Sequence, residues 1–223
     1  MNRPVTLFLL ALGSFVVCGC GKSIDVSERV FLDAVAAVRA GKTDEIRIPE
    51  TPLARDTVLD QLKDLNGLRS LWLPRSAVTD EGLKNLESLP DLTDLDLSGT
   101  RITDEGLRTL GKLRRLVRLV LSDTAVRDEG LVHLEGMTSM VGIGFVRTAV
   151  TDAGIKHLKP MKNLERLDVR ATRVTDKGLL ELKGLPRLRL IRIAQSSISE
   201  AGVNELKKAF PDLEIDRLPP PAK

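Results

Sequence analysis

The side chains that could bind a ligand stand between apolar residues in a series of short segments. Acidic residues come first, at Asp94 and Asp96, followed by a flat patch at Gly142 and Gly144 and then an arginine-rich end. Arginine forks suit carboxylates and phosphates, and a lone tryptophan is a typical binding anchor. We therefore expect non-covalent recognition by shape and charge, with these candidate binding residues: Trp72, Asp94, Asp96, Arg118, Arg147, Arg166, Asp168, Arg170 and Arg192.

These candidate positions do not repeat from one segment to the next. A surface matched to one partner would show such variation, and so would a surface that is free of packing constraint. The alternative interpretation is therefore a solvated face whose charges keep the protein soluble, with Trp72 covered by its neighbours.

Other groups with chemical potential recur at a fixed spacing. One acidic column consists of Asp80, Asp104, Asp128, Asp152, Asp176 and Glu200. Each acid occurs where a helix is expected to begin, with no oxygen-rich loop around it, so helix capping explains the column better than calcium binding. Either the acid or the residue before it, as in Asp80 or Thr79, can be the cap. His133 and His157 fall on the expected helical side, with no carboxylate or thiol to complete a metal set. We expect no metal, no cofactor and no enzyme; a hydrolase would require activity that depends on these histidines.

The elements that position these side chains recur every 24 residues without insertion or loss. The Thr-Asp-Glu-Gly run at 79–82 returns at 103–106, and related tetrapeptides follow at 127–130, 151–154, 175–178 and 199–202. A period of this size indicates stacked supersecondary units that share one core. Within each unit, two apolar residues separated by one, such as Leu95 and Leu97, predict a strand.

Two further columns have structural explanations. A small hydroxyl residue follows each strand, at Ser76, Thr100, Thr124, Thr148, Thr172 and Ser196. We expect these hydroxyls to satisfy backbone groups of the next turn rather than to act as nucleophiles. A glycine column runs from Gly82 to Gly202, and its members are expected to leave space for close packing of neighbouring units.

The segment Leu92-Thr-Asp-Leu95-Asp-Leu97-Ser-Gly-Thr100 matches Leu-x-x-Leu-x-Leu-x-x-(Asn, Cys or Thr), and residues 53–215 resemble the leucine-rich repeat family. The following Ile-Thr-Asp-x-Gly-Leu is similar to the ribonuclease-inhibitor and cysteine-containing branch, although threonine stands where that branch has cysteine or asparagine. The resemblance implies an α/β leucine-rich repeat solenoid, or horseshoe, with a parallel β-sheet on the concave face and helices on the convex face. It also implies protein recognition, without specifying a partner.

Composition limits the class of partner. Apolar residues make up 42% of the 223, enough for a continuous core, and 34 basic residues nearly balance 31 acidic ones. This balance argues against general nucleic-acid binding. Aromatic residues are 3% with no tyrosine, which removes the stacking platforms of a base reader. Both cysteines lie within the first twenty residues, so the repeats can hold no internal disulfide or thiolate metal site.

The first residues have the pattern of an export signal. Residues 1–19 combine an early arginine with a short apolar run, and Val17-Cys18-Gly19-Cys20 resembles a bacterial lipoprotein lipobox. Cys20 would then be acylated, with residues 20–24 as a lipidated tether to a membrane of the bacterial envelope. The alternative is an ordinary secretory signal that yields a periplasmic or secreted protein with Cys20 as a free thiol.

The rest of the chain divides around the repeats. Residues 25–52 predict a helical cap and first strand, 53–209 the repeats, 210–218 a closing cap and 219–223 a flexible tail. Strands are expected at 46–48, 71–73, 95–97, 119–121, 143–145, 167–169, 191–193 and 213–215. Such a sheet would span roughly 34 Å, enough for one protein-sized contact.

Together these features favour an exported, membrane-anchored repeat lipoprotein that binds a protein or another envelope or extracellular macromolecule through its concave sheet. The alternative is a structural envelope spacer without a specific ligand.

Overall fold

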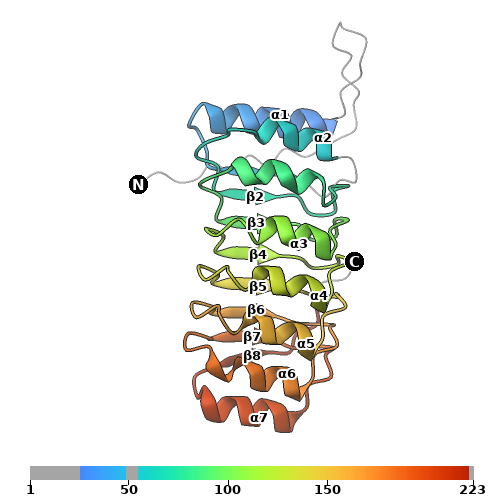
Figure 1. The fold of residues 1–223 in the computed structure, drawn as a ribbon, viewed down its shortest axis with the longest axis vertical. Coiled ribbons are helices and arrows are strands. Elements are labelled where there is room, and N and C mark those ends of the chain that lie inside the picture. Colours follow the sequence, from blue (N-terminus) through green and yellow to red (C-terminus); the bar gives the residue numbers. More distant parts are fainter. Residues whose placement is uncertain (1–25, 49–54, 221–223) are drawn as a thin grey trace, which may run out of the picture.

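The chain folds into an elongated stack of repeats, with a sheet along one side and helices along the other (Figure 1). The structure is a computed structural model that describes residues 26–48 and 55–220. The predicted signal segment, Cys20 and the tether lie outside these described residues. The α/β solenoid expected from the repeat is confirmed.

Parallel strands follow one another in sequence order within one sheet of eight. They are β1 Glu45–Arg47, β2 Ser70–Trp72, β3 Asp94–Asp96, β4 Arg118–Val120, β5 Gly142–Gly144, β6 Arg166–Asp168, β7 Leu190–Arg192 and β8 Glu214–Asp216. From β2 to β8, residues 24 apart lie side by side, as in the pairing of Leu95 with Leu119. The 24-residue period of the sequence therefore sets the register between neighbouring strands.

The strands are shifted by one residue from the predicted ranges. Strands β1 to β7 begin one residue earlier than expected, and β8 begins one residue later. The inward residue Leu95 stands at the centre of β3, flanked by two residues that face outward. The second inward residue, Leu97, lies beyond the strand, where its amide still donates to the Val120 carbonyl at 2.9 Å as the chain begins to turn.

Short helical segments cover the other face of the sheet (Figure 1). The α-helices are α1 Val26–Arg39, α2 Asp56–Leu59, α3 Asp104–Leu110, α4 Asp128–Leu131, α5 Asp152–Ile155, α6 Asp176–Glu181 and α7 Glu200–Ala209. The 3-10 segments are η1 Asp60–Leu62, η2 Gly82–Ser88, η3 Val132–Leu134, η4 Lys156–Leu158 and η5 Leu182–Gly184. A repeat of fixed length leaves room for only one or two helical turns between strands.

One continuous apolar core lies between the strands and the helices. Helix α1 covers the first end of the core and buries Phe31, Val35 and Val38. Helix α7 covers the other end and buries Val203 and Leu206. These longer helices cover apolar cross-sections that would otherwise face water, as a solenoid requires at its ends. Among the described residues, the segment predicted as an N-terminal cap contains helix α1 and strand β1.

Hydroxyls of the column that follows the strands form hydrogen bonds within their own repeats, although hydrogen bonds with the next turn were expected. The Thr100 hydroxyl donates to the Leu97 carbonyl at 2.6 Å, and Thr124, Thr148 and Thr172 make the equivalent bond. Three residues separate donor and acceptor, so each bond closes a local turn at the end of a strand. Ser76 differs, because its buried hydroxyl has no hydrogen-bond partner among the described residues.

The acidic column joins neighbouring repeats. Asp80 accepts hydrogen bonds from the Thr103 amide at 2.9 Å and from the Thr103 hydroxyl at 2.6 Å. Thr103 in turn caps α3, because its hydroxyl accepts from the amide of Glu105 at 3.3 Å. Of the two capping residues that the sequence allows, the threonine is therefore the cap. The interpretation of the acid as the cap of its own helix is wrong, because the acid binds the capping residue of the next repeat.

Glycine is required beside these aspartates. A Cβ atom at Gly106 would lie 2.3 Å from the Asp80 Oδ1 atom. At Gly154 the corresponding distance to Asp128 Oδ1 would be 2.4 Å, and Gly82, Gly130, Gly178 and Gly202 meet an aspartate in the same way. The prediction that this column allows close packing is confirmed, and the group that needs the space is the carboxylate.

The turn after each strand passes through the left-handed backbone region. Positive φ values occur at Arg75, Gly99, Asp123, Arg147, Ala171 and Gln195, which are 24 residues apart. Residues other than glycine rarely adopt this backbone conformation, so we attribute it here to the geometry of the repeated turn. It carries the side chains of Asp123 and Arg147 beside the exposed face of the sheet.

The last described residues fold back onto the repeats. The carbonyls of Leu218 and Pro219 accept hydrogen bonds from Arg170 at 3.4 and 3.3 Å. The segment predicted as a flexible tail therefore begins in contact with the repeat domain. Within the part of the chain that the structure describes, no helix is long and apolar enough to span a bilayer.

Candidate functional site

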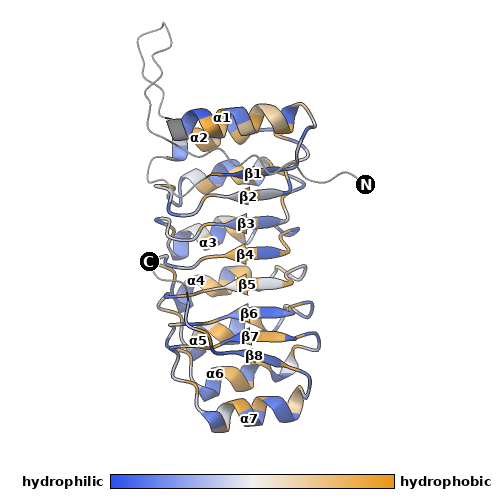
Figure 2. Cartoon of the chain, turned by 180° about the vertical axis from the view of Figure 1, so that it is seen from behind, coloured by the Kyte–Doolittle hydropathy of each residue, from blue (hydrophilic) through white to orange (hydrophobic). Residues whose placement is uncertain are grey.

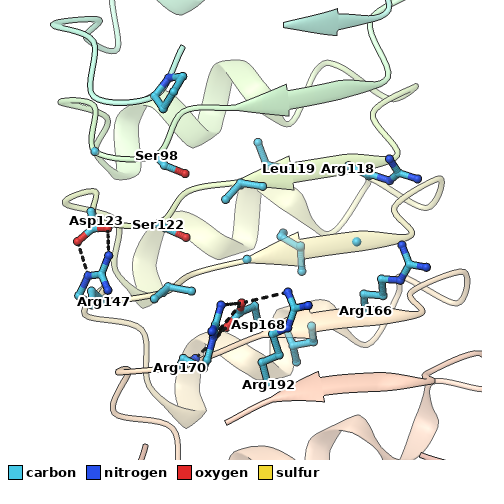
Figure 3. Close-up of a pocket in the computed structure, with 18 of the residues that line it drawn as sticks. Ser98, Arg118, Leu119, Ser122, Asp123, Arg147, Arg166, Asp168, Arg170 and Arg192 are labelled. Carbon is cyan, nitrogen blue, oxygen red and sulfur yellow. Dashed lines mark hydrogen bonds and ion pairs between the residues drawn. The ribbon is translucent and has the colours of Figure 1, made fainter. Parts of the chain in front are cut away.

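A hollow of about 490 Å³ lies on the exposed face of the sheet over β4 to β7. Its lining contains six arginines and two aspartates, a strong excess of positive charge for a chain of net charge +3. Its charged lining residues are Arg75, Arg118, Asp123, Arg147, Arg166, Asp168, Arg170 and Arg192. Figure 3 shows all of these groups except Arg75 around the middle of the sheet, with arginines at both ends of the strands.

The floor of the hollow is strand β5, which presents no outward side chain. Gly142 and Gly144 occupy its two outward positions, between β4 and β6. In Figure 2, β5 is pale between neighbouring strands that carry stronger colour. Val146, just beyond the strand, is buried and extends the floor. We call this channel along β5, walled by the side chains of β4 and β6, the trough.

Two arginines stand at the amino ends of the strands on either side of the trough. Arg118 of β4 and Arg166 of β6 both pair in register with Gly142. An Arg118 Nη1 atom lies 3.3 Å from Asp94, and 60% of the Arg118 side chain remains exposed. Among the described residues, Arg166 has no ion-pair or side-chain hydrogen-bond partner. Its guanidinium group is thus available to a ligand.

An internal ion pair closes the other end of the trough. Arg147 donates from Nε and Nη2 to the Asp123 carboxylate, each at 2.6 Å, and both side chains are about four-fifths buried. The hydrogen bonds to Asp123 raise the pKa of the Arg147 guanidinium, so this group stays charged. The pair fixes the position of Arg147 and neutralises it, which makes it a wall rather than a free contact group.

A second charged network lines the β6–β7 side. Asp168 accepts from Arg170 Nε at 2.9 Å and Nη2 at 2.7 Å, and Arg192 Nη1 lies 3.7 Å from the same carboxylate. Arg192 also donates to Asp216 at 3.1 Å. The amide of Leu218 and then Arg192 hold the pKa of Asp216 below its ordinary value. These arginines are therefore largely committed within the protein.

The acidic candidates and the tryptophan lie outside the hollow. The Arg47 guanidinium stacks over the Trp72 ring, 3.4 Å from its centroid, so a neighbour covers the indole. Asp96 accepts from the amide of Ser98 at 2.8 Å and from its hydroxyl. Asp94 accepts from its neighbour Thr93 at 2.7 Å and pairs with an arginine. The structure thus brings together the predicted arginines with Asp168, and leaves these three residues apart.

Two charged residues of the hollow were not among the predicted contacts. Arg75 and Asp123 lie after the strands in the left-handed turn, and only their equivalence with Arg147 in the repeat could have indicated them. Gly142 and Gly144 were predicted as a flat patch, and they form the floor.

Metal-binding geometry is not found among the described residues, where no group of three potential ligands lies together. His157 does meet a carboxylate, contrary to expectation, because its Nδ1 atom lies 2.6 Å from Glu135 Oε1. The helix of one repeat places Glu135 beside the next, a contact that the spacing of the two histidines did not reveal.

Comparisons with known proteins agree with this architecture. A family model described as a leucine-rich repeat matches residues 88–111, and no curated protein matches the chain. Among solved structures, internalin C2 from Listeria monocytogenes is 21% identical with a TM-score of 0.67, over 85% of this chain and 80% of that one. A second internalin from that organism is 19% identical with a TM-score of 0.51, over 71% and 50%. The repeated sequence, the parallel sheet and these matches show that the chain has the leucine-rich repeat fold.

Proposed function

We propose that this protein is a non-enzymatic binding protein that recognises a protein partner through the hollow on its sheet. One observation carries the proposal: the hollow has an excess of arginine, and Arg166 has no partner among the described residues. Unpaired charge on a shaped surface lowers the free energy of binding a partner that supplies the opposite charge. The residues that line the hollow include no histidine, cysteine or lysine, which also favours binding over catalysis.

The proposal places the protein outside the cytoplasm of a bacterium. Residues 1–19 would direct export, and acylation of Cys20 would anchor the repeats in the envelope with the hollow open to a partner. The intact mass of the protein, purified from membranes of its own or a related bacterial host, tests this part. A chain that begins at an acylated Cys20, and a Cys20→Ser form that lacks the added lipid mass, are the expected results. An unlipidated wild-type chain would remove the anchor.

Site-specific cross-linking tests the binding function. A photoreactive amino acid at Ser122, in the hollow, is compared with one at Lys177, which is exposed on α6. In cells that naturally make the protein, we expect one discrete cross-linked product from position 122 and none from position 177. A spacer without a specific ligand would give no discrete product at either position, and that result would contradict the proposed function.

A further inference from the structure

We propose that the trough binds an extended acidic segment of the partner protein. In this arrangement a carboxylate lies between Arg118 and Arg166, and an apolar side chain two residues along the segment lies over Gly144 and Val146. The inference rests on the proposed function, because it names the chemistry of the partner at the same hollow.

The first step is that the fold does not require glycine in β5. A Cβ atom at Gly142 would meet nothing closer than 3.8 Å, and one at Gly144 nothing closer than 3.7 Å, which are ordinary contact distances. Neither residue has positive φ. Glycine in a strand nevertheless costs stability, because the unfolded chain gains freedom and the folded sheet loses packing. Gly142 is partly exposed and Gly144 is buried at the bottom of the hollow, so the two glycines form a floor without side chains that folding alone does not explain.

The second step is the charge that faces this floor. The Arg118 Cγ and Arg166 Cβ atoms lie 3.8 and 3.9 Å from the position of a Gly142 Cβ, so both arginine stems flank the open position. Figure 3 shows both guanidinium groups at the same end of the strands, away from Asp168 and Asp123. A carboxylate there would receive charge-assisted hydrogen bonds from Arg166 and from the exposed side of Arg118.

The third step is the size of the trough. Its walls, β4 and β6, are two strand spacings apart, about 9.6 Å, which admits one extended chain lying on the glycine floor. Outward positions along β5 are about 6.6 Å apart, the same spacing as alternate side chains of an extended peptide. A ligand side chain two residues from the carboxylate would thus reach Gly144, with Val120 on one wall, the arginine-paired Asp168 on the other and Val146 beyond it.

The lining also favours a carboxylate over a phosphate. Backbone amides commonly hold phosphate, but the Gly142 amide donates to the Val117 carbonyl at 3.0 Å and the Phe145 amide donates to the Asp168 carbonyl at 2.8 Å. No aromatic side chain among the described residues lines the hollow to stack a base. What remains is two arginines at one end and apolar surface beside them, which suits an acidic and an apolar side chain on one peptide.

The test uses the peptide acetyl-Ser-Glu-Ser-Leu-Ser-amide as the probe, titrated into protein with labelled valine and leucine methyl groups. We expect saturable shifts of the Val120 and Val146 methyl signals, and none at Val132 on the convex side. Replacing Glu by Gln in the peptide, or Arg166→Gln in the protein, is expected to weaken binding about tenfold or more. Arg187→Gln, at an exposed arginine outside the hollow, is the matched control and should leave binding unchanged.

A second variant tests the floor. Gly144→Leu should abolish the Val146 shifts with the fold intact, whereas Gly184→Leu, which adds the same side chain on the convex side, should not. Equal affinity for the Glu and Gln peptides would overturn the inference, as would tighter binding of a phosphoserine form or no shift in the hollow. If the peptide fails while position 122 still cross-links a discrete protein, the inference is wrong and the proposed function stands. If both fail, the proposed function itself is contradicted.

Discussion

Two glycine-to-alanine substitutions should change stability in opposite directions. At Gly106, a new Cβ would lie 2.3 Å from Asp80 Oδ1, so the carboxylate must move away from Thr103. Two hydrogen bonds, of 2.9 and 2.6 Å, would be lost, at about 2–4 kcal/mol in this partly exposed site. Alanine returns about 1 kcal/mol of helix propensity. Gly106→Ala should therefore lower the free energy of unfolding by about 1–3 kcal/mol.

Gly144→Ala should instead stabilise the protein. The new methyl group meets Val120 and Asp168 at 3.7 Å, and removing a strand glycine contributes about 0.5–1 kcal/mol. Equilibrium unfolding in urea, followed by circular dichroism, measures both variants against the wild type, with the slope checked because repeat arrays can unfold in parts. The reasoning is refuted if Gly106→Ala is as stable as the wild type, or if Gly144→Ala is less stable by 1 kcal/mol or more.

Four further substitutions test side-chain hydrogen bonds of the repeats. Arg127→Thr should raise the free energy of unfolding in urea by about 1 kcal/mol. Within the described ranges, the Asp104 carboxylate accepts a hydrogen bond only from the backbone amide of Arg127, and a threonine hydroxyl would add the missing cap of α4. No gain in stability would contradict the role given to the hydroxyl. Thr100→Val should lower the free energy of unfolding by about 1 kcal/mol, because it removes the hydrogen bond to the Leu97 carbonyl. Ser76→Ala should change it by less than about 0.5 kcal/mol, because the Ser76 hydroxyl has no partner among the described residues. Equal losses would show that the Thr100 hydrogen bond contributes nothing. Hydrogen bonds from Ser199 of the next repeat hold the pKa of Asp176 below its ordinary value. The ionised carboxylate therefore contributes fully to folding stability above the ordinary pKa of aspartate, and this contribution is lost as pH falls through the lower pKa of the folded state. The stability difference between wild type and Asp176→Asn should then shrink as pH falls below about 4, and a constant difference would contradict this sign.

The sequence was sufficient to predict what the period controls. Inward residues such as Leu95 recur in every unit, so the order of the strands and the core followed from spacing alone. The strand limits were less predictable, because the last inward residue, Leu97, is buried whether or not it belongs to the strand. The role of the acidic column was misassigned for a related reason: Asp80 lies one residue after a cap within its own repeat, and the Thr103 group that it binds lies 23 residues further along.

The candidate site was predictable only where its residues belong to the sheet. Arg118 and Arg166 face outward because they flank inward leucines, and both line the hollow. Trp72 also faces outward, but Arg47 covers it, and that contact depends on the irregular first unit. Asp123 was missed because a left-handed turn, and not the alternation of a strand, directs its side chain.

The repeat period also determines which arginines have an acidic neighbour in the sheet and which remain available to a ligand. In an in-register parallel sheet, the neighbours of any outward residue are the residues 24 before and after it. Arg192 has Asp168 and Asp216 at those positions and contacts both.

Arg166 has Gly142 and Leu190 at the same offsets, and so no carboxylate can reach it from either adjacent strand. An isolated cation would gain from an acidic neighbour on β5, yet the chain has glycine there. The combination of an unmatched arginine and an empty floor is therefore a property of the sequence itself. This combination is the reason for proposing that the anion that pairs with Arg166 belongs to a partner rather than to the sheet.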